Sequence, residues 1–150
     1  MRWGVAICAA AALTAVSAQA GRHVEMPRQP ESVDIAAGRA IYAEACASCH
    51  GAALEGQPDW QQRNADGTLP APPHDPSGHT WHHGDGVLFL YTRLGGQGFT
   101  EQRGITGFAS GMPAFGDLLT DREIWDVLAY IKSTWPPKLQ EAQQNRTALE

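Results

Sequence analysis

Two cysteines and a histidine within five residues are the part of this sequence with the clearest chemistry. They stand in the segment Cys46-Ala47-Ser48-Cys49-His50. Two residues between the thiols place both sulfur atoms on one turn of chain, where they can add to the two vinyl groups of one porphyrin and form thioethers. The imidazole that follows can then bind the porphyrin iron from one face. The spacing therefore predicts covalent attachment of one haem through Cys46 and Cys49, with His50 as an iron ligand.

Two other kinds of site use a pair of cysteines at this spacing. A thioredoxin-like dithiol usually follows a strand, whereas the residues around Cys46 and Cys49 indicate helix. A structural zinc site normally needs a second pair of Cys or His ligands, and the sequence contains no cysteine after Cys49. Haem attachment is therefore the interpretation that the pattern favours.

The N-terminus has the features of a secretory signal peptide. Arg2 provides a positive charge, Val5 to Val16 is an apolar, alanine-rich run, and Ala18-Gln19-Ala20 is a small-x-small cleavage pattern. We expect residues 1–20 to be removed on export to the periplasm, together with Cys8. The apolar run is short for a membrane span, and an uncleaved segment that anchors the protein to the membrane is the alternative.

The charge balance argues against nucleic acid as a partner. The 150 residues carry a formal charge of -5, and the only lysines are Lys132 and Lys138. Binding to nucleic acid depends on clusters of basic residues, and none is present. The expected partners are redox proteins, whose identity the sequence does not indicate.

The apolar spacing predicts a helix that leads into the haem motif. An irregular tether over residues 21–33 should be followed by a helix that begins at Ser32 or Asp34 and ends at about Ser48. Gly38 lies in its middle, where glycine costs about 1 kcal/mol relative to alanine. A glycine at such a position usually marks the close approach of another element.

Residues 51–80 have little periodicity and are expected to form a loop. Asp66-Gly67 predicts a turn, and Pro70-Ala71-Pro72-Pro73 predicts an extended, rigid segment. Trp60 is either a core residue or, in a haem protein, a donor of its indole N–H to a haem propionate.

Four of the six histidines lie within ten residues, and the sequence leaves their role open. Imidazole suits copper and nickel, so they can form a metal site. One of them can instead be an alternative axial ligand of the haem. The third interpretation is that they are polar loop residues that cap the next helix and bond to the backbone. The four are His74, His79, His82 and His83.

A second helix is expected from about Gly84 to Leu94, ended by Gly95-Gly96. A long glycine-rich loop over residues 95–111 should follow. Such a loop needs a function or a large object to wrap around.

Met112 stands on that loop, in the segment Gly111-Met112-Pro113. Gly111 allows close approach of the backbone and Pro113 stiffens the loop, so the thioether can reach iron from the face opposite His50. A core methionine is the alternative. After the signal peptide the sequence offers only one other methionine, Met26, which lies in the tether. Met112 is therefore the predicted sixth ligand.

The last helix has clear boundaries in the sequence. Thr120-Asp121-Arg122-Glu123 is a capping box, and Pro136-Pro137 marks the end. Between them, apolar residues recur at helical spacing. Residues 137–150 form the remainder of the chain; those after Pro137 are polar and lack an apolar stripe, and we expect a solvated or frayed tail.

Taken together, these residues resemble class I c-type cytochromes, the small exported bacterial mono-haem kind. The match spans Asp34 to Pro136, which we take as the domain. The resemblance rests on three elements in order: the Cys46-x-x-Cys49-His50 motif after a helix, Gly111-Met112-Pro113 on a loop, and a final helix with Tyr130 near its end. It implies an all-α cytochrome c fold, with three to four helices and long loops around one covalently bound haem.

The resemblance also implies specific contacts. The first and last helices should cross, with Gly38 and Tyr42 against Val127 and Tyr130. A proline carbonyl in Ala71-Pro72-Pro73 should accept the Nδ1 proton of His50 and so fix the ring. The stretch from Gly78 to His83 looks like one found in a subset of small exported bacterial cytochromes. The ring of lysines that mitochondrial-type cytochromes use for docking is absent, so their partners cannot be transferred to this chain.

The leading hypothesis for function is a periplasmic carrier of single electrons, with iron bound by His50 and Met112. Because both axial positions are then filled, no site remains for a substrate, and the protein need not be an enzyme. One alternative is a haem-bearing subunit of a larger periplasmic oxidoreductase. Another is a periplasmic metal-binding module that uses the His74–His83 stretch.

Overall fold

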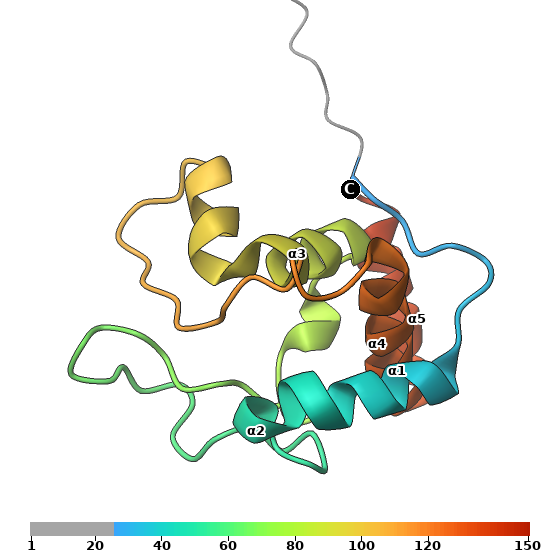
Figure 1. The fold of residues 1–150 in the computed structure, drawn as a ribbon, viewed down its shortest axis with the longest axis horizontal. Coiled ribbons are helices and arrows are strands. Elements are labelled where there is room, and N and C mark those ends of the chain that lie inside the picture. The colour runs from blue at the N-terminus through green and yellow to red at the C-terminus, as the bar shows by residue number, and fades with distance from the viewer. Residues whose placement is uncertain (1–25) are drawn as a thin grey trace, which may run out of the picture.

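The computed structural model describes residues 26–150. The predicted signal peptide over residues 1–20, with Cys8, and the first part of the tether lie outside the described residues. Residues 26–34 are irregular, as expected for the tether. The described part of the chain consists of helices joined by long loops, without a strand (Figure 1), which confirms the all-α class. None of its helices is both long and apolar enough to cross a membrane.

The first helical rod leads directly to the cysteine motif. Helix α1, Ile35–Ile41, begins where the Asp34 carboxylate accepts a hydrogen bond from the N–H of Ala37 at 2.9 Å. The rod continues through a π-helical turn, η1 (Tyr42–Cys46), into α2 (Ala47–His50). The helix predicted to end near Ser48 is confirmed, but its middle is a π turn, which the sequence pattern did not indicate. Such turns occur frequently at functional sites.

Helix α4, Asp121–Ser133, has the boundaries that the sequence indicates. The Thr120 side chain accepts a hydrogen bond from the N–H of Glu123, and the Glu123 carboxylate accepts one from the N–H of Thr120 at 2.8 Å. The predicted capping box is therefore confirmed. The helix ends before Pro136, as expected.

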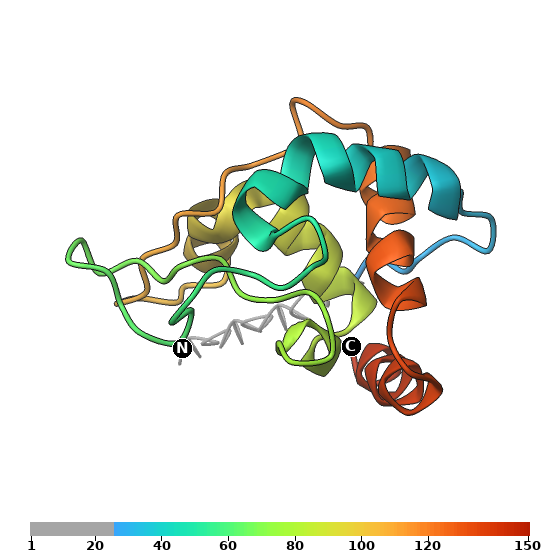
Figure 2. The same ribbon diagram turned by 90° about the horizontal axis from the view of Figure 1, so that it is seen from below.

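Helix α1 crosses α4 at close range (Figures 1 and 2). A Cβ atom on Gly38 would collide with the carbonyl group of Asp126 and lie 3.0 Å from the amide nitrogen of Val127. The rings of Tyr42 and Tyr130 are in contact, with 5.5 Å between their centroids. The crossing implied by the resemblance is confirmed, and it explains the glycine in the middle of the first helix.

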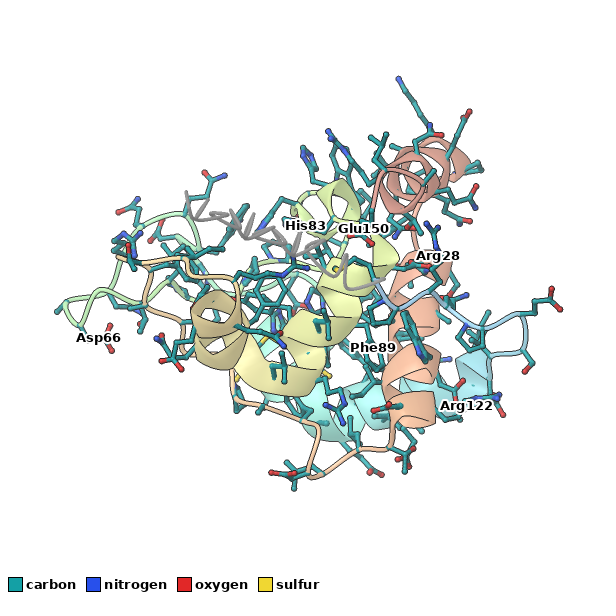
Figure 3. All side chains as sticks on the ribbon, turned by 90° about the horizontal axis from the view of Figure 1, so that it is seen from above. Arg28, Asp66, His83, Phe89, Arg122 and Glu150 are labelled. Atoms are coloured by element: carbon teal, nitrogen blue, oxygen red, sulfur yellow. The ribbon has the colours of Figure 1, made fainter. Side chains whose placement is uncertain are left out.

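Two clusters of buried apolar side chains form the core. One lies where the first helical rod meets α4, and the other lies between α3 (Asp85–Gln102) and α4. In the second cluster the rings of Phe89 and Trp125 stack with 4.4 Å between their centroids, and Phe89 lies between the two helices in Figure 3. The first cluster consists of Tyr42, Leu54, Val127, Ile131 and Trp135, and the second of Phe89, Ile124, Trp125 and Leu128.

Helix α3 is longer than the sequence indicates. The first helical segment ends near Leu94, as expected, because Gly95 has φ +72° and ψ 163°, which are not helical values. A second helical segment, which the sequence did not indicate, follows the kink and continues to Gln102, and α3 denotes the two together. The added turns are held by packing, since Phe99 is buried and its ring lies 5.4 Å from that of Tyr91. The predicted loop over residues 95–111 is thus a true loop only after Gln102.

The C-terminal segment is also a helix, α5 (Pro137–Thr147), so the expected frayed tail is wrong, although most residues of the segment are exposed to solvent. The sequence of α5 lacks an apolar stripe, and polar hydrogen bonds hold the helix in place. Gln143 is only 2% exposed and donates a hydrogen bond to Oδ1 of Asp85 at 2.9 Å. Glu150 accepts a hydrogen bond from the N–H of Gly86 at 2.8 Å, at the start of α3 (Figure 3).

Two long loops, residues 51–79 and 103–120, extend to the same side of the molecule, away from α5 (Figures 1 and 2). The first contains the predicted turn at Asp66-Gly67, where the N–H of Gly67 donates to the carbonyl of Asn64 at 2.9 Å. Asp66 marks the far tip of this loop in Figure 3. The loops enclose the side of the fold on which the cysteine motif ends.

Candidate functional site

The two cysteines lie on the last turns of the first helical rod. Cys46 ends the π turn and is half-buried, whereas Cys49 lies in α2 and is exposed. Both are free thiols. Burial, with a smaller contribution from Cys49, raises the pKa of Cys46 to about 11, so this thiol is protonated at neutral pH. These two thiols, three residues apart, are available for addition to two vinyl groups.

His50, the last residue of α2, is buried and held by the loop that follows. Its Nδ1–H donates a hydrogen bond to the carbonyl oxygen of Pro72, with 2.8 Å between the two atoms. The proline carbonyl contact implied by the resemblance is therefore confirmed. Burial lowers the pKa of His50, opposed by the hydrogen bond to Pro72. The imidazole is thus neutral with Nδ1 protonated, which leaves the Nε2 lone pair for a metal ion.

The chain turns sharply after His50. Gly51 has φ +82°, which favours glycine, and ends α2. The hydroxyl of Tyr42 donates to the carbonyl of Gly51 at 3.0 Å, and the N–H of Gly56 donates to the carbonyl of His50 at 2.8 Å. These bonds fix the backbone on both sides of the imidazole.

The segment that carries Met112 lies against the kink in α3. The N–H of Gly96 donates to the carbonyl of Met112 at 3.1 Å, and a Cβ on Gly95 would lie 2.6 Å from the amide nitrogen of Ala114. Three residues on, the N–H of Phe115 donates to the carbonyl of Thr92 at 3.1 Å. The two glycines, interpreted from sequence as the end of a helix, also make room for the Met112 loop.

A side-chain bond completes this support. The Ser110 hydroxyl accepts from the N–H of Met112 at 3.2 Å and lies 3.0 Å from the Tyr91 hydroxyl. Sequence analysis did not single out Ser110 or Tyr91. A hydroxyl two residues before a candidate ligand is a weak signal, because a loop serine commonly bonds to backbone nearby.

The four histidines do not come together as a metal site. Among residues 26–150, no group of three or more His, Cys, Asp or Glu side chains is placed to hold a metal ion. The metal-site interpretation of the His74–His83 stretch is therefore wrong. The rings instead pair with separate neighbours. His79 stacks on Trp60 and lies edge-on to His83, and His82 contacts Trp81.

The same histidines do not cap α3 through their side chains. The helix begins at Gly84 without a side-chain cap, and the Glu150 carboxylate accepts from the N–H groups of Gly86 and Val87. The expectation that these histidines cap the next helix is therefore wrong. The carboxylate of Glu150 caps the helix instead.

His74 contacts His50 directly. The two rings stack with 3.9 Å between their centroids and 17° between their planes. Because it lies beside the imidazole that would bind one face of the haem, His74 cannot also supply the opposite face. Burial above all, and the neighbouring His50 and His79, hold the pKa of His74 well below its usual range.

Trp60 belongs to neither core cluster. It is half-buried and stacks on His79 with 5.3 Å between ring centroids and 9° between planes. Its indole N–H makes no hydrogen bond within residues 26–150, so the role as a propionate donor stays a prediction. A pocket of about 430 Å³ lies where the two loops meet, lined by Arg63, Gly67, Gly107, Phe108 and Ala109.

Comparison with protein families identifies the fold. The family model described as Cytochrome c matches residues 35–135, about two thirds of the chain. The chain belongs to the cytochrome c family. No curated protein and no solved structure matched the chain. Members of the family carry covalent haem c and transfer electrons, and this cytochrome is accordingly a haem-binding electron carrier.

The residues at the site fit haem c. Cys46 and Cys49 are unpaired thiols with the required spacing. The imidazole of His50 is neutral and oriented through Nδ1, which is the form that binds iron. Helix α5 lies outside the residues that the family model matches. The hydrogen bonds of Gln143 and Glu150 therefore join a segment beyond the matched residues to α3.

Proposed function

We propose that this cytochrome carries single electrons in the periplasm, with its haem iron bound by His50 and Met112. The observation that carries the proposal is the 2.8 Å hydrogen bond from Nδ1 of His50 to the Pro72 carbonyl, which fixes the tautomer and leaves Nε2 free. Family membership supports the carrier role, and the ligand pair and the location are the proposed additions.

His50 is suited to be an iron ligand that stays in place during electron transfer. It ends a helical rod that packs on α4, and its carbonyl and its ring are each hydrogen-bonded to the loop that follows. These two bonds fix the backbone of His50 and the position of its Nδ1 atom. We therefore expect the position of this ligand to change little when the iron gains or loses an electron.

Met112 is proposed as the second ligand because hydrogen bonds fix the backbone of its loop against α3. Hydrogen bonds from Gly96 and Ser110 restrain the backbone of Met112, and the bond from Phe115 to Thr92 continues the attachment. The side chain of Met112 is half-buried. Within residues 26–150 the alternative methionine is Met26, which contacts Arg103 and the start of α3.

When bound, the haem supplies the Fe(III)/Fe(II) couple, and a thioether ligand raises its potential relative to a second imidazole. The chain's own residues supply the attachment, the two ligands and the exclusion of water. If His50 and Met112 both bind the iron, no coordination position would be left for a substrate. We therefore propose a carrier that works between protein partners rather than an enzyme.

The visible spectrum of the haem-loaded ferric protein tests this proposal. A thioether on ferric haem gives a weak charge-transfer band in the far red, which two imidazoles do not give. We expect a low-spin spectrum with this band. A high-spin spectrum, or a low-spin spectrum without the band, would contradict the ligand pair. N-terminal sequencing of the exported protein tests the location, with Gly21 as the expected first residue.

A further inference from the structure

The ring of His74 contacts the ring of His50, and the proposed electron-carrier function gives it no role. The two imidazoles are stacked, with 3.9 Å between centroids and an angle of 17° between planes. The ring of Tyr42 also contacts His74, edge-on, with 5.9 Å between the ring centroids. His74 therefore contacts two aromatic rings that both belong to the first helical rod.

The backbone of His74 is fixed from two directions. Its N–H donates to the carbonyl of Leu54 at 2.8 Å, and its carbonyl accepts from the indole N–H of Trp135 at 2.7 Å. Pro73, the preceding residue, has a restricted φ. Leu54 and Trp135 are both buried. The position of the His74 ring is consequently set by the core.

The side chain of His74 contacts His50 through the flat face of its ring. It forms no hydrogen bond with any residue in the range 26–150, and its Nδ1 is buried without a partner. An unpaired polar atom of this kind costs about 1–3 kcal/mol. The contacts that the ring makes within the described residues are those with the rings of His50 and Tyr42.

A face contact supplies a restraint that the hydrogen bond to Pro72 does not. That bond fixes the distance from Nδ1 of His50 to one carbonyl oxygen, but the ring can still tilt about the line that joins these atoms. A flat neighbour at van der Waals distance opposes such tilting. Both restraints come from one segment, residues 72–74, which is anchored to the core at its end by Trp135.

We propose that His74 is a positioning residue that fixes the plane of the His50 ring, and through it the orientation of that ligand on the haem iron. The inference rests on the proposed ligand role of His50. The orientation of an axial imidazole determines how it interacts with the iron orbitals, and neighbours of metal ligands tune the metal in this way. His74 itself does not bind the iron.

The first test uses the wild-type protein loaded with haem. In the reduced, diamagnetic state, nuclear Overhauser cross-peaks should connect the ring protons of His50 and His74. Their absence from a fully assigned spectrum would overturn the stacking and the inference with it. This measurement needs no variant, so it is independent of any effect on folding.

The second test compares substitutions by electron paramagnetic resonance of the ferric protein. His74→Phe keeps a flat ring, and we expect the wild-type g values. His74→Leu keeps apolar volume without a flat face, and we expect a shifted and broadened largest g value while the spectrum stays low-spin. His82→Leu is the matched control, since His82 is exposed and contacts Trp81 instead; its g values should equal those of the wild type.

The outcomes separate the two proposals. If His74→Leu has the g values of the wild type, the positioning role is wrong even though His50 remains the ligand. If the wild-type protein is itself high-spin or lacks the far-red band, the proposed ligand pair fails first. A shift in His74→Phe as large as that in His74→Leu would also contradict the inference, because a flat ring would then not suffice.

Discussion

The backbone N–H of Gly96 donates a hydrogen bond to the carbonyl oxygen of Met112 at 3.1 Å, and this bond joins the kink of α3 to the loop of the proposed iron ligand. Gly95 makes the contact possible, because it has φ +72° and carries no side chain. The kink therefore positions the loop, and the first prediction follows from it.

Gly95→Ala should weaken the bond between Met112 and iron. The new Cβ would lie 2.6 Å from the amide nitrogen of Ala114. The backbone conformation of Gly95, φ +72° and ψ 163°, is essentially restricted to glycine, so an alanine there adds about 1–3 kcal/mol of strain. We expect the far-red band to decrease and cyanide to bind the ferric protein about tenfold more tightly. Gly98→Ala is the control, since its Cβ would be in ordinary contact, 3.6 Å from that of Leu94. Equal spectra for the two variants would contradict this role of Gly95.

Met112→Ala should abolish the far-red band, lower the reduction potential and open the iron to carbon monoxide and cyanide. Met112→His should remain six-coordinate at a lower potential, because a second imidazole stabilises Fe(III). Met26→Leu, His82→Ala and His83→Ala should leave the band unchanged. A band that survives Met112→Ala would show that another residue is the sixth ligand. Optical spectra and redox titration provide these measurements.

Gly38→Ala should destabilise the fold without touching the haem site. An added Cβ collides with the backbone of Asp126, and overpacking of this kind costs about 3 kcal/mol. The measurement is the free energy of unfolding in denaturant. Ala40→Gly, at an exposed position of the same helix, should cost only about 1 kcal/mol. Similar losses in both variants would mean that α1 and α4 are not in close contact at Gly38.

The docking of α5 should depend on pH through Asp85. Burial by itself raises the pKa of this carboxyl, but the hydrogen bond and charge of Lys132, with smaller contributions from Gln143 and Gln29, hold it below its ordinary value. A lowered pKa in the folded state means that ionised Asp85 stabilises the fold above its unfolded pKa. That stabilisation is lost as the pH falls below the ordinary value of 3.8.

Asp85→Asn should therefore reduce the loss of stability in acid. At neutral pH it should cost on the order of 2 kcal/mol, because Lys132 lies 2.6 Å from Asp85 and is left without its partner in a mostly buried position. Thermal unfolding at pH 7 and pH 3 measures both effects. Arg93→Gln, which removes an exposed ion pair to Asp121, is the control and should change stability by less than about 1 kcal/mol. A wild-type pH profile in Asp85→Asn would contradict the prediction.

We expect the redox partner to present a basic or neutral surface. The chain has a formal charge of -5, and loss of the proposed signal peptide would remove Arg2 and no acid. Opposite charges speed association at low ionic strength, and salt screens them. The rate of electron exchange with the native partner should fall, or stay level, as salt is added. A steep rise with salt would indicate repulsion and an acidic partner.

Local chemistry in the sequence was sufficient for much of the site. The spacing of Cys46, Cys49 and His50 indicated haem attachment, because attachment to one porphyrin requires neighbouring groups. The capping box located the start of α4 because it also depends on neighbouring residues, Thr120 and Glu123. The resemblance implied the bond from His50 to Pro72, which the structure confirms. Gly38 indicated a close approach of another element before its partner was known.

The tertiary structure alone decided the features that depend on residues distant in the chain. Helix α5 has no apolar stripe and is held by Gln143 through Asp85, 58 positions away. Gly95 ends the first helical segment of α3 as the sequence indicated, but a second segment follows, in which the ring of Phe99 is buried. His74 meets His50 because Trp135 anchors its backbone. Local propensity and periodicity contain no information on such contacts, since they form only when separate segments pack together.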